Sequence, residues 1–176
     1  RIDDLVARQT PVPFAEECTS STDKKTYRTK ELQVQLTPTR RIPIFLTLPP
    51  ADAKGPFPAV VCINGHSGNR HSPYFQETFK REGDIATQDQ AYGGFGTLLA
   101  ERGFITISTD MDVRTESNDH KVFDPARTLM GERLWCAMRC VDYVSSLPDV
   151  DASRIGCAGL SLGGEIAMWL AAMDVR

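Results

Sequence analysis

A serine between two glycines, Gly159-Leu160-Ser161-Leu162-Gly163, constrains the fold of this chain more than any other feature. Its G-x-S-x-G spacing is that of a nucleophile elbow, a sharp turn from a strand to a helix that exposes the serine hydroxyl. Such a turn crowds the backbone on both sides of the serine, and glycine relieves the crowding because it lacks a Cβ. The sequence therefore predicts a strand that ends before Ser161 and a helix that begins after it.

The residues on both sides of the serine fit this turn. Arg154 to Ala158 has the pattern of a short strand, and apolar residues downstream recur at helical spacing. These apolar residues are Ile166, Ala167, Leu170, Ala171 and Met173. A G-x-S-x-G that arises by chance lacks such flanking elements, so we interpret Ser161 as a catalytic nucleophile and not as part of an ordinary Gly-Ser turn.

The rest of the chain alternates strands and helices. Two runs of alternating apolar residues, Tyr27 to Leu36 and Arg41 to Leu48, predict an antiparallel hairpin. Two strands of continuous apolar residues follow the hairpin, at Pro58 to Ile63 and Phe104 to Thr109. Two helices are predicted at Thr97 to Arg102 and Gly131 to Leu147. This order predicts an α/β fold with a mostly parallel sheet, flanking helices and the N-terminal hairpin at the edge.

We expect one domain over residues 1–176, with residues 1–23 as a lead-in of short helix and loop and residues 24–176 as the sheet and helices. His66, His71 and His120 all precede Ser161, whereas the acid and the histidine follow the serine in enzymes with this elbow. We therefore expect the chain to be the N-terminal portion of a longer domain. The missing C-terminal half, or a second chain, would supply both groups and cover the strand before the serine, which is otherwise an exposed edge.

The loop after Pro58 to Ile63 carries the second part of the predicted site. In a hydrolase with this elbow, the backbone N–H groups of Leu162 and of a residue in this loop, here His66, form the oxyanion hole. Ser67 is not followed by a double glycine and a helix, so it is not a candidate nucleophile. His66 and His71 are considered as metal ligands, but no Asp, Glu or His cluster recurs at a suitable spacing, and no metal site is predicted.

Two further segments are candidates for substrate binding. The aromatic stretch between His71 and Phe95 is long for a connection in a compact domain, and it either shapes a pocket or packs on itself at the surface. Arg114 follows the next strand, at the edge where ligands bind in open α/β sheets. Arg114 could contact an acidic or sugar substrate, although an ion pair with a neighbouring Asp or Glu is the commoner outcome.

Composition excludes several other classes of function. The 20 basic and 23 acidic residues give a net charge of −3, which does not favour nucleic-acid binding. The longest apolar run has eight residues, against about twenty for a membrane span. Five cysteines, four of them in predicted strands or helices, indicate buried free thiols, and Cys136 and Cys140 fit core packing better than a metal site. We expect a soluble protein, in the cytoplasm or secreted after loss of a signal peptide, without a cofactor.

Three motifs together resemble the α/β-hydrolase superfamily, in particular its dienelactone hydrolase-like and acetyl xylan esterase-like branch. They are the elbow with Val150 to Gly156 before it, the helix segment Met138 to Tyr143, and the Asn64-Gly65-His66 loop. The resemblance covers about Pro58 to Arg176 and implies Ser161 as the nucleophile, with the main chains of Leu162 and His66 as the oxyanion hole. Dienelactone hydrolases proper carry cysteine at the nucleophile position, so Ser161 favours the esterase side.

The resemblance implies a serine carboxylesterase that acts through an acyl-enzyme at Ser161. Its substrate would be a small ester or an acylated sugar, including sugars of plant polysaccharides. Two alternatives stay open: a peptidase or thioesterase of the same fold, and a non-catalytic fragment that lacks its acid and base. Under each of these readings, residues 1–176 alone are expected to be inactive.

Overall fold

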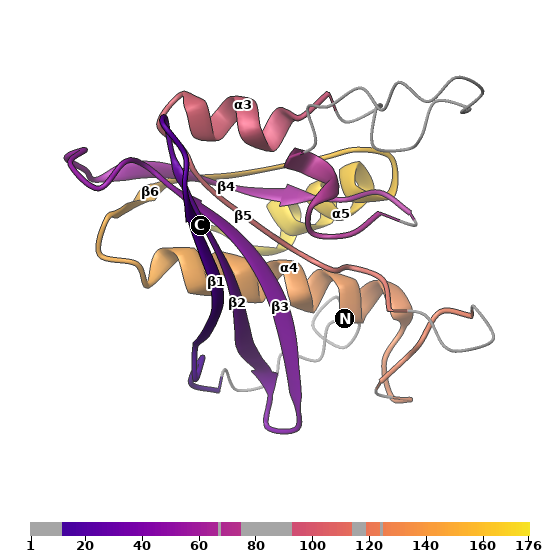
Figure 1. The fold of residues 1–176 in the computed structure, drawn as a ribbon. Helices are drawn as coiled ribbons and strands as arrows, with labels where there is room; N and C mark the ends of the chain where they lie inside the picture. The colour runs from indigo at the N-terminus through magenta and orange to yellow at the C-terminus, as the bar shows by residue number, and fades with distance from the viewer. Residues whose placement is uncertain (1–11, 67, 75–92, 114–118, 124) are drawn as a thin grey trace, which may run out of the picture.

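A six-stranded sheet with the order β1-β2-β3-β5-β4-β6 organises the chain (Figure 1). The computed structural model describes residues 12–66, 68–74, 93–113, 119–123 and 125–176. Its strands are β1 (Glu17–Asp23), β2 (Arg28–Thr37), β3 (Arg40–Leu48), β4 (Phe57–Ile63), β5 (Ile105–Thr109) and β6 (Val150–Gly159). Its helices are the 3-10 turn η1 (Ser72–Tyr74), α3 (Phe95–Glu101), α4 (Leu129–Ser145) and α5 (Leu162–Met173). The α/β-hydrolase fold class predicted from the sequence is confirmed.

The sheet is mixed rather than mostly parallel in the described part of the chain. β1, β2, β3 and β5 pair with antiparallel neighbours, whereas β4 is parallel to both β5 and β6. The predicted hairpin is β2 and β3, and its alternation is confirmed by burial of every second residue. The buried residues are Leu32, Val34, Leu36, Ile42, Ile44 and Leu46. They form the antiparallel side of the core.

Strand β1 corrects the expected lead-in of helix and loop. Residues 17–23 form the edge strand beside β2, and all seven are exposed. The sequence of β1 has no apolar alternation, because this strand is held by backbone hydrogen bonds to β2 and buries no side chain. Periodicity could not have revealed it. Residues 1–11, the rest of the lead-in, lie outside the described residues.

Helices cover both faces of the sheet (Figure 1). α4 and α5 pack against each other on one face, and α3 lies on the other. α3 ends as predicted, because Gly103 has a φ of +85° and the N–H of Phe104 donates to the carbonyl of Leu99 over 3.1 Å. α4 is the most buried helix, and it carries Arg139 into the core at 2% exposure. None of the described helices is long and apolar enough to cross a membrane.

The cysteines are free thiols, as predicted. Cys62, Cys136 and Cys140 are buried, and Cys18 alone among the five is exposed. Burial raises the pKa of the Cys136 thiol to about 11 and that of Cys62 to about 12. Both thiols therefore stay protonated at neutral pH and act as small apolar side chains.

Candidate active site

The turn between β6 and α5 has the geometry that the serine motif predicts. β6 ends at Gly159 and α5 begins at Leu162, so Ser161 stands at the point where strand becomes helix. Ser161 has a φ of 54° and a ψ of −121°, and its side chain is exposed. A positive φ at a residue with a Cβ is strained, and such strain collects at functional sites. The backbone thus holds the Ser161 hydroxyl in the open.

The two glycines of the motif are there because the backbone passes too close for any side chain. A Cβ on Gly159 would overlap the main chain of Gly163, and a Cβ on Gly163 would overlap the carbonyl of Ile63 and lie 2.7 Å from that of Asn64. Gly156, on the same strand, has open space at the corresponding position. The glycine requirement is therefore local to the elbow.

The loop after β4 lies against this turn. β4 and β6 are parallel neighbours, and Ile63 pairs with Gly159 in register. Their carboxyl ends therefore meet at one edge of the sheet, where Asn64 to His66 continues from β4 and Ser161 from β6. The N–H of Gly68 donates to the carbonyl of Gly65 over 3.1 Å, which turns this loop back on itself. Leu162 and His66, the predicted oxyanion residues, thus belong to adjoining segments.

A network of charges fixes the far end of the same loop. Arg70 donates to Asp110 over 3.1 Å and to Glu31 over 2.9 Å, and His71 lies 3.0 Å from the other oxygen of Glu31. Burial alone would raise the pKa of Glu31, but the hydrogen bond from Arg70 and the charges of His71 and Arg70 together lower it. The ionised Glu31 ties the loop to β2. His71 is thereby directed to Glu31.

A second cluster, which the sequence did not predict, lies on the other side of the loop. His66 Nε2 is 3.3 Å from His120 Nε2, and His120 Nδ1 is 3.4 Å from Asp112 Oδ1. The side chain of Asp112 is only 4% exposed and also accepts from Arg133. The prediction that no metal site is present, which rested on spacing in the sequence, stays a prediction. The members of the cluster come from two connections, His66 from the loop after β4 and both Asp112 and His120 from the segment between β5 and α4, and only the position of Asp112 after a buried strand hinted at it.

Two of the acidic residues considered as partners of Arg114 pair with other arginines. Asp110 pairs with Arg70, and Asp112 pairs with Arg133. Arg114 itself, like Ser67 and most of the stretch between His71 and Phe95, lies outside the described residues. Its role in substrate binding stays a prediction.

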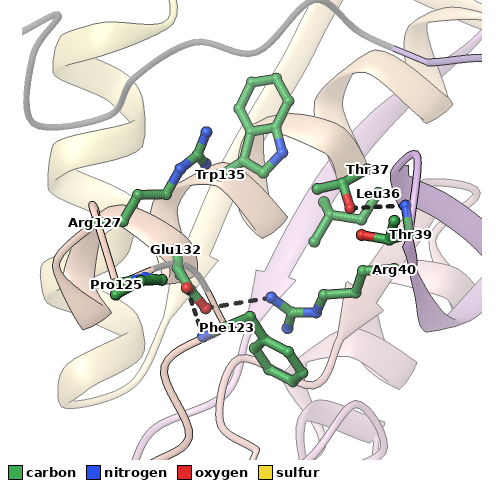
Figure 2. Close-up of a pocket in the computed structure, with 9 residues that line it drawn as sticks. All are labelled: Leu36, Thr37, Thr39, Arg40, Phe123, Pro125, Arg127, Glu132 and Trp135. Atoms are coloured by element: carbon green, nitrogen blue, oxygen red, sulfur yellow. Dashed lines mark hydrogen bonds and ion pairs between the residues drawn. The ribbon is translucent and has the colours of Figure 1, made fainter.

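Two cavities lie near these elements. One, of about 480 Å³, is mostly apolar and lies between α3 and the end of β6, where it reaches Gly159 and Leu160. The other, of about 330 Å³, lies between the turn joining β2 to β3 and the start of α4 (Figure 2). Figure 2 shows Arg40 donating to Glu132 across this second cavity, with the guanidinium 3.6 Å from the centre of the Phe123 ring. Only the first cavity includes residues of the elbow.

Comparison with known proteins agrees with this geometry. The model of the family described as acetyl xylan esterase (AXE1) matches residues 16–176. The acetyl esterase Axe7A of Xylanibacter ruminicola is 24% identical over 137 residues, which cover 78% of this chain and 31% of that protein. Two solved structures share the fold. An acetyl xylan esterase from Paenibacillus sp. R4 has a TM-score of 0.66 at 21% identity, over 94% of this chain and 52% of the other. A glucuronoyl esterase from Solibacter usitatus has a TM-score of 0.65 at 19% identity, over 96% and 51%.

The chain is shorter than the proteins that it resembles. It spans between 24% and 43% of the length of the curated relatives that it matches.

Proposed function

Since the chain belongs to the acetyl xylan esterase (AXE1) family, we propose that Ser161 is the nucleophile of a serine carboxylesterase. The observation that carries this proposal is the strained, exposed turn at Ser161, where φ is 54° and two glycines admit no Cβ. A backbone under strain persists only where surrounding structure holds it, and here the strain exposes a hydroxyl. An ordinary surface turn would have no need of that geometry.

The proposed reaction proceeds through an acyl-enzyme. The Ser161 oxygen attacks the ester carbonyl, its proton passes to a histidine, and the collapse of the tetrahedral intermediate releases the alcohol. Water then attacks the acyl-serine and releases the acid. In enzymes with this elbow the histidine follows the serine in the chain, so we expect the base to be none of His66, His71 and His120.

The oxyanion of the intermediate would be held by two backbone N–H groups. Leu162 is the first residue of α5, and the first N–H groups of a helix have no partner within the helix and point out of its N-terminus. His66 lies in the loop that adjoins this helix start. We propose that the N–H groups of Leu162 and His66 bind the oxyanion, and that no metal ion is needed for this step.

The substrate we propose is an acylated sugar, with acetyl as the first acyl group to test. The support is the family to which the chain belongs and its fold, which an acetyl xylan esterase and a glucuronoyl esterase share. Arg114 follows β5 in the sequence, and we propose that its guanidinium contacts the sugar.

A labelling experiment tests the nucleophile, and a substrate panel tests the reaction class. The natural polypeptide that carries this chain is treated with a fluorophosphonate probe and digested, and we expect the label on Ser161 and none in the Ser161→Ala variant. Hydrolysis of acetylated xylo-oligosaccharides is then compared with that of a peptide anilide and an acyl thioester. Labelling elsewhere, or equal labelling of the variant, would refute Ser161. A preference for the anilide or thioester would refute the esterase.

A further inference from the structure

We propose that His66 and His120 bind a zinc ion at the loop beside the elbow, with Asp112 orienting His120. The three residues offer ligand atoms that all lie within 4.8 Å of one another. His66 comes from the loop after β4, and Asp112 and His120 come from the connection between β5 and α4, so the fold brings His66 to the other two. The zinc site uses the His66 imidazole, whereas the proposed oxyanion hole uses the His66 main-chain N–H, so zinc binding can be tested whether or not the esterase proposal holds.

The distance between the two rings fits a shared ion as well as it fits a hydrogen bond. Zn–N bonds of about 2.0–2.1 Å at the tetrahedral angle place two ligand nitrogens about 3.3–3.4 Å apart. The His66 and His120 Nε2 atoms are 3.3 Å apart and within hydrogen-bond distance. A zinc ion could therefore replace the hydrogen bond with little movement of either ring.

Asp112 provides the support that metal-binding histidines usually have. Such a histidine donates its second ring N–H to a carboxylate, which sets the tautomer and the ring orientation. His120 Nδ1 lies 3.4 Å from Asp112 Oδ1, on the side of the ring away from His66. Arg133 Nη2 also lies 3.4 Å from this Nδ1 and can only donate to it. Zinc binding through Nε2 therefore requires Nδ1 to take the proton and turn from Arg133 to Asp112 as its acceptor. The second oxygen of Asp112 is buried and has no hydrogen-bond partner among the described residues.

Arg133 limits the affinity of this site. Its guanidinium donates from Nε to Asp112 Oδ1 over 2.8 Å, and its Nη2 lies 3.4 Å from His120 Nδ1. A guanidinium offers only donors and cannot bind zinc, and its charge offsets that of the carboxylate. Among the described residues, the zinc would thus be bound by two imidazoles beside a carboxylate whose charge Arg133 offsets, and we expect weaker binding than at a closed structural zinc site.

Solvent can complete the coordination. The His66 side chain is exposed, and that of His120 is 30% exposed, so water reaches the two open corners of the tetrahedron. Two protein ligands with open positions are typical of an exchangeable site and not of a closed structural one. Imidazole nitrogen suits zinc better than it suits magnesium or calcium, which prefer oxygen ligands.

A zinc titration tests the proposal. The natural polypeptide is stripped with a chelator, desalted and titrated with Zn²⁺ against a chromogenic indicator, and we expect one equivalent to bind. His120→Asn should weaken this binding at least about tenfold, the loss typical of a disrupted metal site. His71→Asn is the matched control, because His71 is in the same loop but contacts Glu31. We expect its zinc affinity to be that of the unaltered protein.

Two further measurements separate binding from folding. Zinc should raise the thermal unfolding temperature of the unaltered protein and of His71→Asn, but not of His120→Asn. Cobalt added in place of zinc should give the visible absorption of a tetrahedral site. The proposal is overturned if the stripped protein binds no Zn²⁺ at a free zinc concentration of about 100 μM. It is also overturned if His120→Asn binds Zn²⁺ as tightly as the unaltered protein.

Discussion

The two ends of β6 each carry a serine, and the two serines are held in opposite ways. At the start of the strand, Ser153 donates from its hydroxyl to Asp151 over 2.6 Å, and Arg154 donates to the same carboxylate over 2.6 Å. At the other end, Ser161 stands in a strained turn with a φ of 54° and is exposed. The first serine is fixed by its side chain, and the second by its backbone.

This difference shows which end of a parallel strand can present a reactive side chain. The start of β6 lies at the surface, where the Asp151 carboxylate accepts from the backbone and hydroxyl of Ser153 and from Arg154. The end of β6 holds a side chain in the open by means of its neighbours, which are glycines for steric reasons. The Ser153 hydroxyl donates to a carboxylate that is fixed at the surface, whereas Ser161 is exposed at a turn where a general base could accept its proton.

The largest expected effect comes from exchanging each serine for alanine. Ser161→Ala should lower ester hydrolysis about 10⁴-fold or more, because it removes the nucleophile. Ser153→Ala, at the other end of the strand, should leave the rate unchanged. Both rates are measured on p-nitrophenyl acetate with the natural polypeptide. Equal loss in both variants would show that the strand ends are equivalent and contradict the comparison.

Removing one backbone N–H tests the oxyanion hole. Leu162→Pro deletes the proposed donor while keeping α5, because proline is favoured at the first position of a helix. We expect a loss of about 10²- to 10³-fold in kcat. Leu162→Ala keeps the N–H and is the control, with a loss well under tenfold. A circular dichroism spectrum that matches between the two variants shows that the helix is retained, and equal kcat values would contradict the assignment.

Adding a methyl group at the elbow should cost more folding stability than adding one within β6. Gly163→Ala places a Cβ against the carbonyls of Ile63 and Asn64, which belong to the backbone and cannot give way. We expect a loss of about 3 kcal/mol in the free energy of unfolding, as for severe overpacking. Gly156→Ala meets no atom within 4 Å and should change it by less than about 0.5 kcal/mol. Urea denaturation measures both, and similar midpoints would refute the steric argument.

The smallest expected effect is a shift in the pKa of Asp151, at the start of β6. The hydrogen bonds from Ser153 and Arg154 lower the pKa of Asp151 from 3.8 to about 2. Because the folded pKa lies below the unfolded one, the contribution of Asp151 to stability is present above pH 3.8 and is lost as the pH falls toward 2. In Ser153→Ala the pKa of Asp151 should move back toward 3.8, as followed by NMR of the carboxyl carbon. An unchanged value would show that the hydroxyl does not hold the carboxylate.

Local patterns predicted most elements because their causes are local. The alternation in β2 and β3 follows from burial of one sheet face, and Gly103 ends α3 because it alone tolerates a φ of +85° there. The apolar face of α4 was predicted as well. Its buried Arg133 and Arg139 were not, because Arg133 donates to Asp112 and Arg139 donates to the carbonyl of Val12, both distant in sequence, in addition to the ion pair of Arg139 with nearby Asp142.

The candidate site also has one part that local sequence predicted and one part that it did not. The turn at Ser161 was readable because strand, glycines, serine and helix are consecutive, and each residue type has a steric reason within that segment. The cluster of His66, Asp112 and His120 could not be predicted, because His66 precedes His120 by 54 residues. Nothing in the spacing of those residues indicates that the loops after β4 and β5 converge.

By itself, the sequence determined the elbow, the hairpin, the buried strands and the helices, since steric limits and hydrophobic periodicity act over a few residues. The tertiary structure alone decided that β5 lies between β3 and β4, that the polar residues 17–23 add an edge strand, and that His66 meets His120. Those outcomes depend on which backbone groups find partners and which loops share an edge of the sheet, and both are set only when distant segments pack together.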